Sequence, residues 1–130
     1  MAVTVLLDTN ALLWSLLEPH KLSSTALTAL QNPETVLLVS SASAWEISIK
    51  HKLGKLTSAS EVLSDFSGHL KRLGADVLVI TPEHALVAGA LPLHHRDPFD
   101  RMLIAQAGVE GVAVVTNDEV FANYDVRVLW

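Results

Sequence analysis

Short apolar runs recur along the chain and predict the strands of a β-sheet. They are rich in Val, Leu and Ile and cover residues 3–8, 35–40, 76–80, 112–116 and 126–129. Most of these runs lack polar alternation, which is typical of strands that are buried on both faces. The pattern therefore predicts a central sheet of about five strands.

Helix signals occupy the segments between these runs. Trp45, Ile49 and Leu53 follow one another at helical spacing, and Gly54 ends that helix. Pro82 and Pro98 each suit the first position of a helix. The predicted helices cover residues 11–17, 23–31, 43–53 and 58–73, two more begin at 82 and 98, and a short one spans 119–123.

The alternation of strands and helices predicts the topology. Strand–helix–strand units join parallel strands through right-handed crossovers, so helices cover both faces of the sheet. A chain of 130 residues is long enough for one domain with a sizeable core. We therefore expect a single α/β domain over residues 1–130, with a mostly parallel sheet.

Polar residues of the same three types stand at the ends of two strands. Asp8-Thr9-Asn10 follows the first strand, and Thr116-Asn117-Asp118 ends the fourth. Glu46 lies in the first turn of the helix after the second strand, and Asp97 and Asp100 open the helix before the fourth. The carboxyl ends of parallel strands share one edge, where ligands bind. We expect acids from these distant segments to meet there.

Helix capping is an alternative role for each acid. Capping positions are open to Asp8, Thr9 or Asn10 at the first helix, to Glu46 in a capping box with Ser43, to Asp97 before Pro98, to Asp100 in the first turn of that helix, and to Asp118 before the short helix. Capping does not explain why an acid stands at each strand end that faces the same edge. From the residues alone, a shared carboxylate site and separate helix caps remain open.

Composition narrows the class of protein. Half of the residues are apolar and 18% are charged, which excludes a disordered chain. The chain has no cysteine, so disulfides, thiolate metal ligands and cysteine nucleophiles are excluded. Its start lacks the basic region of a signal peptide, and no apolar stretch approaches the roughly 18 residues that span a bilayer. We expect a cytoplasmic protein that does not bind membranes.

The net charge of −5 argues at first sight against a nucleic-acid-binding protein. However, Lys50, His51, Lys52 and Lys55 form a local basic cluster, and a carboxylate site is itself acidic until it binds cations. Lys50 lies four residues after Glu46. It suits either a surface ion pair with that acid or a contact to a phosphate backbone, and both interpretations stay open.

Clustered carboxylates without cysteine favour Mg²⁺ or Mn²⁺ over a structural zinc ion. Paired ions about 3.5–4 Å apart can activate water and stabilise the leaving oxygen of a phosphodiester. The sequence has no glycine-rich phosphate loop and no serine elbow of a hydrolase. His94 and His95 are adjacent and lack the spacing of a helical metal pair, so we expect them on the surface or in a supporting position.

Four segments, in this order, resemble the PIN-domain toxins of VapC type over nearly the whole chain. They are Leu6-Leu7-Asp8-Thr9-Asn10, then Ser43-Ala44-Trp45-Glu46-Ile47 with Lys50 and Gly54-Lys55-Leu56, then residues 95–107, which read HRDPFDRMLIAQA, and finally Val115-Thr116-Asn117-Asp118 with the closing residues 126–130. The resemblance implies a three-layer α/β/α domain and an Mg²⁺- or Mn²⁺-dependent endoribonuclease. It also implies a homodimer that is inhibited by a cognate antitoxin.

The resemblance also implies a role for each polar residue. Asp8 is a direct metal ligand, and Thr9 and Asn10 orient the site. Glu46, Asp100 and Asp118 are the other acids, with Thr116 and Asn117 supporting Asp118 and with Asp97 as a cap and supporting acid. The candidates for RNA-backbone contacts are Lys50, Lys52, Lys55, Arg96 and Arg101.

Two other functions and one structural question remain open. A phosphatase that forms an aspartyl-phosphate at Asp8 needs a second acid two residues later, where Asn10 stands. A PIN-like binding module without catalysis does not need all four acids. For the homodimer, the apolar residues Leu12, Leu13, Leu16 and Leu17 suit an interface, but they suit a core equally well.

Overall fold

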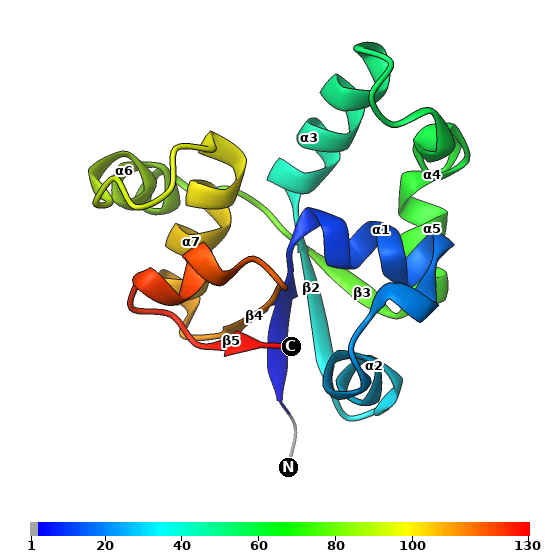
Figure 1. Ribbon diagram of the computed structural model, residues 1–130, viewed down its shortest axis with the longest axis horizontal. Helices are drawn as coiled ribbons and strands as arrows, with labels where there is room; N and C mark the ends of the chain where they lie inside the picture. Colours follow the sequence, from blue (N-terminus) through cyan, green and yellow to red (C-terminus); the bar gives the residue numbers. More distant parts are fainter. Residues whose placement is uncertain (1–2) are drawn as a thin grey trace.

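A five-stranded parallel sheet forms the centre of the protein, as a computed structural model of residues 3–130 shows (Figure 1). Its strands are β1 (Thr4–Leu7), β2 (Val36–Ser40), β3 (Ala75–Leu78), β4 (Ala113–Val115) and β5 (Val128–Leu129). They are arranged in the order β3-β2-β1-β4-β5, and every neighbouring pair is parallel. The predicted parallel α/β sheet is confirmed. The domain predicted over residues 1–130 also includes Met1 and Ala2, which lie outside the described residues.

Helices cover both sides of the sheet and make three layers (Figure 1). On one side lie α1 (Thr9–Leu17), α2 (Ser24–Gln31), α4 (Ser60–Ser64) and α5 (Phe66–Leu73), and on the other α6 (Pro82–Ala90) and α7 (Pro98–Glu110). Helix α3 (Ser41–Lys52) continues from the carboxyl end of β2, and the short 3₁₀ segments are η1 (Pro19–Lys21), η2 (Thr57–Ala59) and η3 (Glu119–Asn123). Within residues 3–130, no helix combines the length and the apolar character that a membrane crossing requires.

Strand β1 contributes side chains to two hydrophobic clusters, because successive side chains point to opposite faces of a strand. Val5 and Leu7 pack in one cluster with Leu12 of α1. Leu6 packs in the other cluster with Leu103 of α7 and with Phe121. The central strand is therefore fixed from both faces, and so is the position of the residue that follows it.

The strand order creates a switch point beside β1. From β1 the chain adds β2 and β3 in one direction, then returns to place β4 on the other side of β1. The Asp8 N–H donates to the Val115 carbonyl at 3.0 Å, which ties these two strand ends together. In parallel α/β sheets, ligands bind in the crevice at such a point.

Two local predictions were wrong. The helix expected over residues 58–73 is interrupted at Asp65, whose φ of −152° and ψ of 63° leave the helical region; the Asp65 carboxylate then caps α5 by accepting from the Gly68 N–H at 3.1 Å. The predicted helix start at residue 43 lies at Ser41 with Ser40 as the N-cap, so the capping box that was an alternative role for Ser43 and Glu46 is absent. Both helix starts are set by local caps, Asp65 at Gly68 and Ser40 at Ala42.

Candidate active site

A small polar cavity of about 80 Å³ lies at the carboxyl edge of the sheet. It is lined by eight residues: Asp8, Thr9, Asn10, Glu46, Lys50, Asp97, Asp100 and Asp118. The structure thus brings together the four acids expected at the site, and it adds Asp97 to their surroundings. These acids come from the ends of β1 and β4, from α3 and from the start of α7. Glu46 lies in the second turn of α3 and not in the first turn as predicted, because α3 begins at Ser41.

Asp8 is buried and hydrogen-bonded at this edge. It ends β1, is only 5% exposed, and caps α1 by accepting from the Ala11 N–H at 2.7 Å. Burial raises the pKa of Asp8 to about 6, although hydrogen bonds from the Thr116 hydroxyl and the Ala11 N–H oppose the rise. The negative charges of Glu46 and Asp118 add to it. A cation at this site would relieve both the burial cost and the repulsion.

Glu46 is buried between two partners rather than used as a helix cap. The Thr9 hydroxyl donates to one carboxylate oxygen at 2.6 Å and also lies 3.0 Å from the Ser43 hydroxyl oxygen. The ammonium of Lys50 binds the other oxygen. Burial lowers the pKa of Lys50, but the bond to Glu46 and the nearby acids outweigh it and raise the pKa overall. Lys50 therefore forms the expected ion pair and also lines the cavity.

Asp97 and Asp100 have different roles: Asp97 caps a helix, and Asp100 does not. Asp97 is the N-cap of α7, with one oxygen accepting from the N–H groups of Phe99 at 2.8 Å and Asp100 at 3.1 Å. Asp100 caps nothing and turns into the cavity from the first turn of that helix. Burial, followed by the charges of Asp97 and Glu46, raises the pKa of Asp100 to about 7, against an opposing effect of His95.

Asp118 is joined to Asp8 through Thr116. The Thr116 hydroxyl accepts from the Asp118 N–H at 3.0 Å and donates to the Asp8 carboxylate. One Asp118 oxygen caps η3 through the Val120 N–H at 3.0 Å. Asn117 is exposed and does not line the cavity, whereas Asn10 does. The segments Asp8-Thr9-Asn10 and Thr116-Asn117-Asp118 are thus joined by the contact between Thr116 and Asp8.

An acid of this site can cap a helix and line the cavity at the same time. Asp8, Asp97 and Asp118 each use their Oδ1 atom for a helix N-terminus. The Oδ2 atom of each remains outside these caps. The two interpretations of the acids were therefore not exclusive, because a carboxylate has two oxygens.

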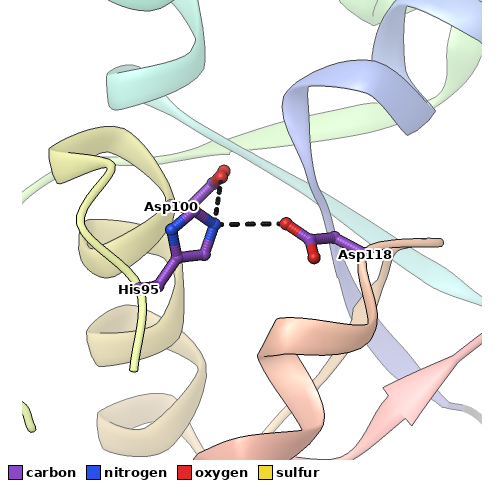
Figure 2. A group of neighbouring side chains, drawn as sticks. All are labelled: His95, Asp100 and Asp118. Carbon is purple, nitrogen blue, oxygen red and sulfur yellow. Dashed lines mark hydrogen bonds and ion pairs between the residues drawn. The ribbon is translucent and has the colours of Figure 1, made fainter. Parts of the chain in front are cut away.

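His95, predicted on the surface or in a supporting position, lies beside two of the acids. Its Nε2 atom lies 2.9 Å from Asp100 Oδ2 and 3.1 Å from Asp118 Oδ2 (Figure 2). These three side chains could hold a metal ion, since their ligand atoms lie within 4.8 Å of one another. The available signal was its place in the HRDPFD segment, directly before two acids.

The donor set fits a hard divalent cation. Five carboxyl groups surround a space of about 80 Å³, and burial and mutual repulsion raise the pKa of two of them. Carboxylate oxygens are the ligands that Mg²⁺ and Mn²⁺ favour. Asp8, Glu46, Asp100 and Asp118 are the residues that would hold such an ion.

Comparison with known proteins agrees with this architecture. The family model of the PIN domain matches residues 5–127. This chain belongs to the PIN domain family. Ribonuclease VapC22 of Mycobacterium tuberculosis is 34% identical over 119 residues, covering 88% of this chain and 87% of that protein.

Solved structures share the PIN fold at low sequence identity. One chain of VapBC2 from Rickettsia felis, bound to a DNA fragment from its promoter, superposes with a TM-score of 0.70 at 14% identity and 97% coverage of both chains. FitAcB from Neisseria gonorrhoeae gives a TM-score of 0.53 at 20% identity and 95% coverage of both chains. At these identities, the likeness concerns the fold.

The five basic residues predicted to contact RNA fall into two groups. Lys52, Lys55 and Arg96 are exposed, and Lys50 is half-buried beside the cavity. Arg101 differs, because its guanidinium donates four hydrogen bonds of 2.9–3.3 Å to the carbonyls of Ala88, Leu91, Pro92 and His95. These bonds use both terminal nitrogens, so the structure does not support the expected phosphate contact of Arg101.

Proposed function

We propose that this PIN domain is an Mg²⁺- or Mn²⁺-dependent endoribonuclease, acting as the toxin of a toxin–antitoxin pair. The observation that carries the proposal is the convergence of Asp8, Glu46, Asp100 and Asp118 on one cavity. The ribonuclease name of the relative at 34% identity supports RNA as the substrate. The VapBC2 neighbour supports a paired antitoxin.

The acids provide the chemistry of hydrolysis. When bound, a divalent ion supplies a water molecule of lowered pKa and a positive charge for the phosphate. Asp8 lines the cavity and has one oxygen outside its helix cap, and Asp100, which caps no helix, lines the same cavity. Thr9 and Lys50 hold Glu46 at a fixed position, so its carboxylate needs little reorganisation. In the absence of a cation, a pKa of about 7 means that the Asp100 carboxyl group is about half protonated near neutral pH.

The exposed cations supply contacts to the RNA backbone. Lys52 and Lys55 follow the ion-paired Lys50 at the end of α3, and Arg96 directly precedes the cap of α7. Contacts of this type position a nucleic acid without reading its sequence. The net charge of −5 then reflects the acids of the cavity and other surfaces rather than the substrate path.

A groove beside the cavity suits a segment of the antitoxin. It has a volume of about 540 Å³ and combines the apolar side chains of Leu13, Trp14 and Leu17 with the charges of Glu18 and Lys21. Asn10 lines both this groove and the acid cavity. A peptide that lies in the groove would therefore reach the acids. Copurification of this chain with a small protein encoded next to it would support binding of an antitoxin.

A second copy of the chain suits the apolar face that lies beside α3 and α7. Trp45 is 62% exposed and meets the Phe99 ring edge-on at 5.2 Å, next to a hollow of about 180 Å³ that Ile80 and Met102 also line. The leucines of α1 are less exposed than Trp45. Leu12 and Leu13 are buried, and Leu16 and Leu17 pack against the same core. We expect Trp45→Asp to shift the molecular mass from dimer to monomer in light scattering, whereas Leu86→Asp on α6 leaves it unchanged.

The nuclease is tested by RNA cleavage with purified protein. We expect cleavage with Mg²⁺ or Mn²⁺ and none with EDTA, and we expect both Asp8→Asn and Asp100→Asn to abolish it. Asp125→Asn, an exposed acid outside the cavity, is the matched control. Cleavage that survives the chelator or both site substitutions contradicts the proposal.

A further inference from the structure

His95 joins two acids that come from separate elements. Asp100 belongs to α7 and Asp118 precedes η3. The imidazole lies between them and is directed at both carboxylates, with the distances of 2.9 and 3.1 Å given above (Figure 2). Two carboxylates this close repel each other unless a donor or a cation lies between them.

The hydrogen-bond partners of His95 determine which ring nitrogen carries the proton. The Asp97 N–H lies 3.3 Å from Nδ1, and a backbone N–H can only donate. Nδ1 is therefore the accepting nitrogen, and the proton of the neutral ring is on Nε2. That N–H then faces Asp100 and Asp118. As a direct metal ligand, Nε2 would have to give up this proton to Nδ1, which would set two donors against each other at Asp97.

The loop that carries His95 is fixed from several sides. The His95 N–H donates to the Tyr124 hydroxyl at 2.8 Å, and this hydroxyl donates to the Pro92 carbonyl at 2.7 Å. Arg101 binds the His95 carbonyl at 3.3 Å. The imidazole also meets the buried Phe121 ring edge-on, with centroids 6.1 Å apart. A ring held in this way has little freedom to follow the acids, so the acids must align to it.

We propose that His95 is a positioning residue that holds Asp118 against Asp100 through its Nε2–H group, and thereby brings the fourth acid into the cation site. Asp118 needs this support more than the other acids, since its side chain is 36% exposed. Its remaining bonds are the η3 cap and the link to Thr116. The inference rests on the proposed function, because it concerns the same cation site.

Calorimetric titration with Mn²⁺ tests the role without an activity assay. His95→Leu should weaken Mn²⁺ binding by about 10- to 100-fold, the usual cost of removing a group that orients a ligand. His94→Leu is the matched control, because His94 is the exposed neighbour whose ring packs on Tyr124 and not on the acids. In an Asp118→Ala background, the effect of His95→Leu should fall below about threefold. An equal effect in both backgrounds overturns the proposal.

Nitrogen NMR of the wild-type imidazole tests the same role without a substitution. We expect the proton on Nε2 both in the metal-free protein and after saturation with Mg²⁺. A proton on Nδ1, or an Nε2 atom bound to the ion, overturns the positioning role. If the wild-type protein binds no Mn²⁺, the proposed function fails together with this inference, whereas unchanged binding by His95→Leu overturns the inference alone.

Discussion

The two halves of the acid cavity are held in different ways. The β1–α3 half consists of Asp8, Thr9, Glu46 and Lys50, and its acids are 5% and 3% exposed. The α7–η3 half consists of His95, Asp97, Asp100 and Asp118, whose side chains include the 36% exposed Asp118. The first half stands directly on the central strand and its helices, whereas the second depends on a loop. The comparison indicates that the first half is fixed by buried contacts to the central strand, whereas the second half is fixed by helix caps and loop contacts that leave Asp118 partly exposed.

Charge removal in each half is the strongest test of this difference. Asp8→Asn keeps the cap of α1, because Asn caps as well as Asp, but it removes the buried charge. We expect its rate of RNA cleavage to fall by at least about 1000-fold, equivalent to at least about 4 kcal/mol of transition-state stabilisation. Asp118→Asn should lower the rate by only about 10-fold, since its carboxylate is more exposed. Equal losses in single-turnover assays would contradict the distinction.

The pH dependence of stability comes from both halves. The pKa values of about 6 for Asp8 and about 7 for Asp100 lie above the usual value of 3.8, so the folded protein binds these protons more tightly than the unfolded chain. Without a cation, the free energy of unfolding should therefore fall as pH rises from 5 to 8, by on the order of 2–4 kcal/mol. Urea unfolding in EDTA measures this change.

Asp100→Asn should remove the larger part of that pH dependence, because its pKa lies higher than that of Asp8. Saturating Mn²⁺ should stabilise the wild-type protein more at pH 8 than at pH 5, since the ion binds ionised carboxylates. A stability that is flat or rises between these pH values in EDTA would show that the two carboxyls are already ionised at pH 5.

Thr9→Val tests the rigidity of the β1–α3 half alone. Valine has the shape of threonine but cannot donate to the Glu46 carboxylate. We expect the free energy of unfolding to fall by about 1–3 kcal/mol, because a buried acceptor loses its partner. Thr28→Val, at an exposed position of α2, is the control and should change stability by less than about 0.5 kcal/mol.

Arg101→Lys tests the loop that supports the α7–η3 half. Lysine lacks the planar fork that reaches the carbonyls of residues 88–95. Hydrogen exchange of amides in residues 91–97 should become about tenfold faster, while amides of β1 keep their protection. The exposed Arg72→Lys is the control. Equal acceleration in the loop and in β1 would indicate global destabilisation instead.

Much of the fold follows from local patterns. The apolar runs predicted the five strands, and the Ser23, Thr81 and Asp97 caps begin helices close to the predicted positions. The acids were found because the carboxyl ends of parallel strands share an edge. The break at Asp65 was not predicted, since its capping of α5 uses a backbone geometry that the surrounding residues do not impose.

The sequence by itself determined the α/β class, the strands and the acids that meet at their ends, because these depend on periodicity and on neighbours along the chain. Only the tertiary structure decided how each side chain is used. Thr9 meets Glu46 across 37 residues, and His95 meets Asp118 across 23. Arg101 likewise donates its hydrogen bonds to carbonyls of the preceding segment. Such contacts depend on the separations and orientations that arise when the helices pack on the sheet, and no local pattern encodes these.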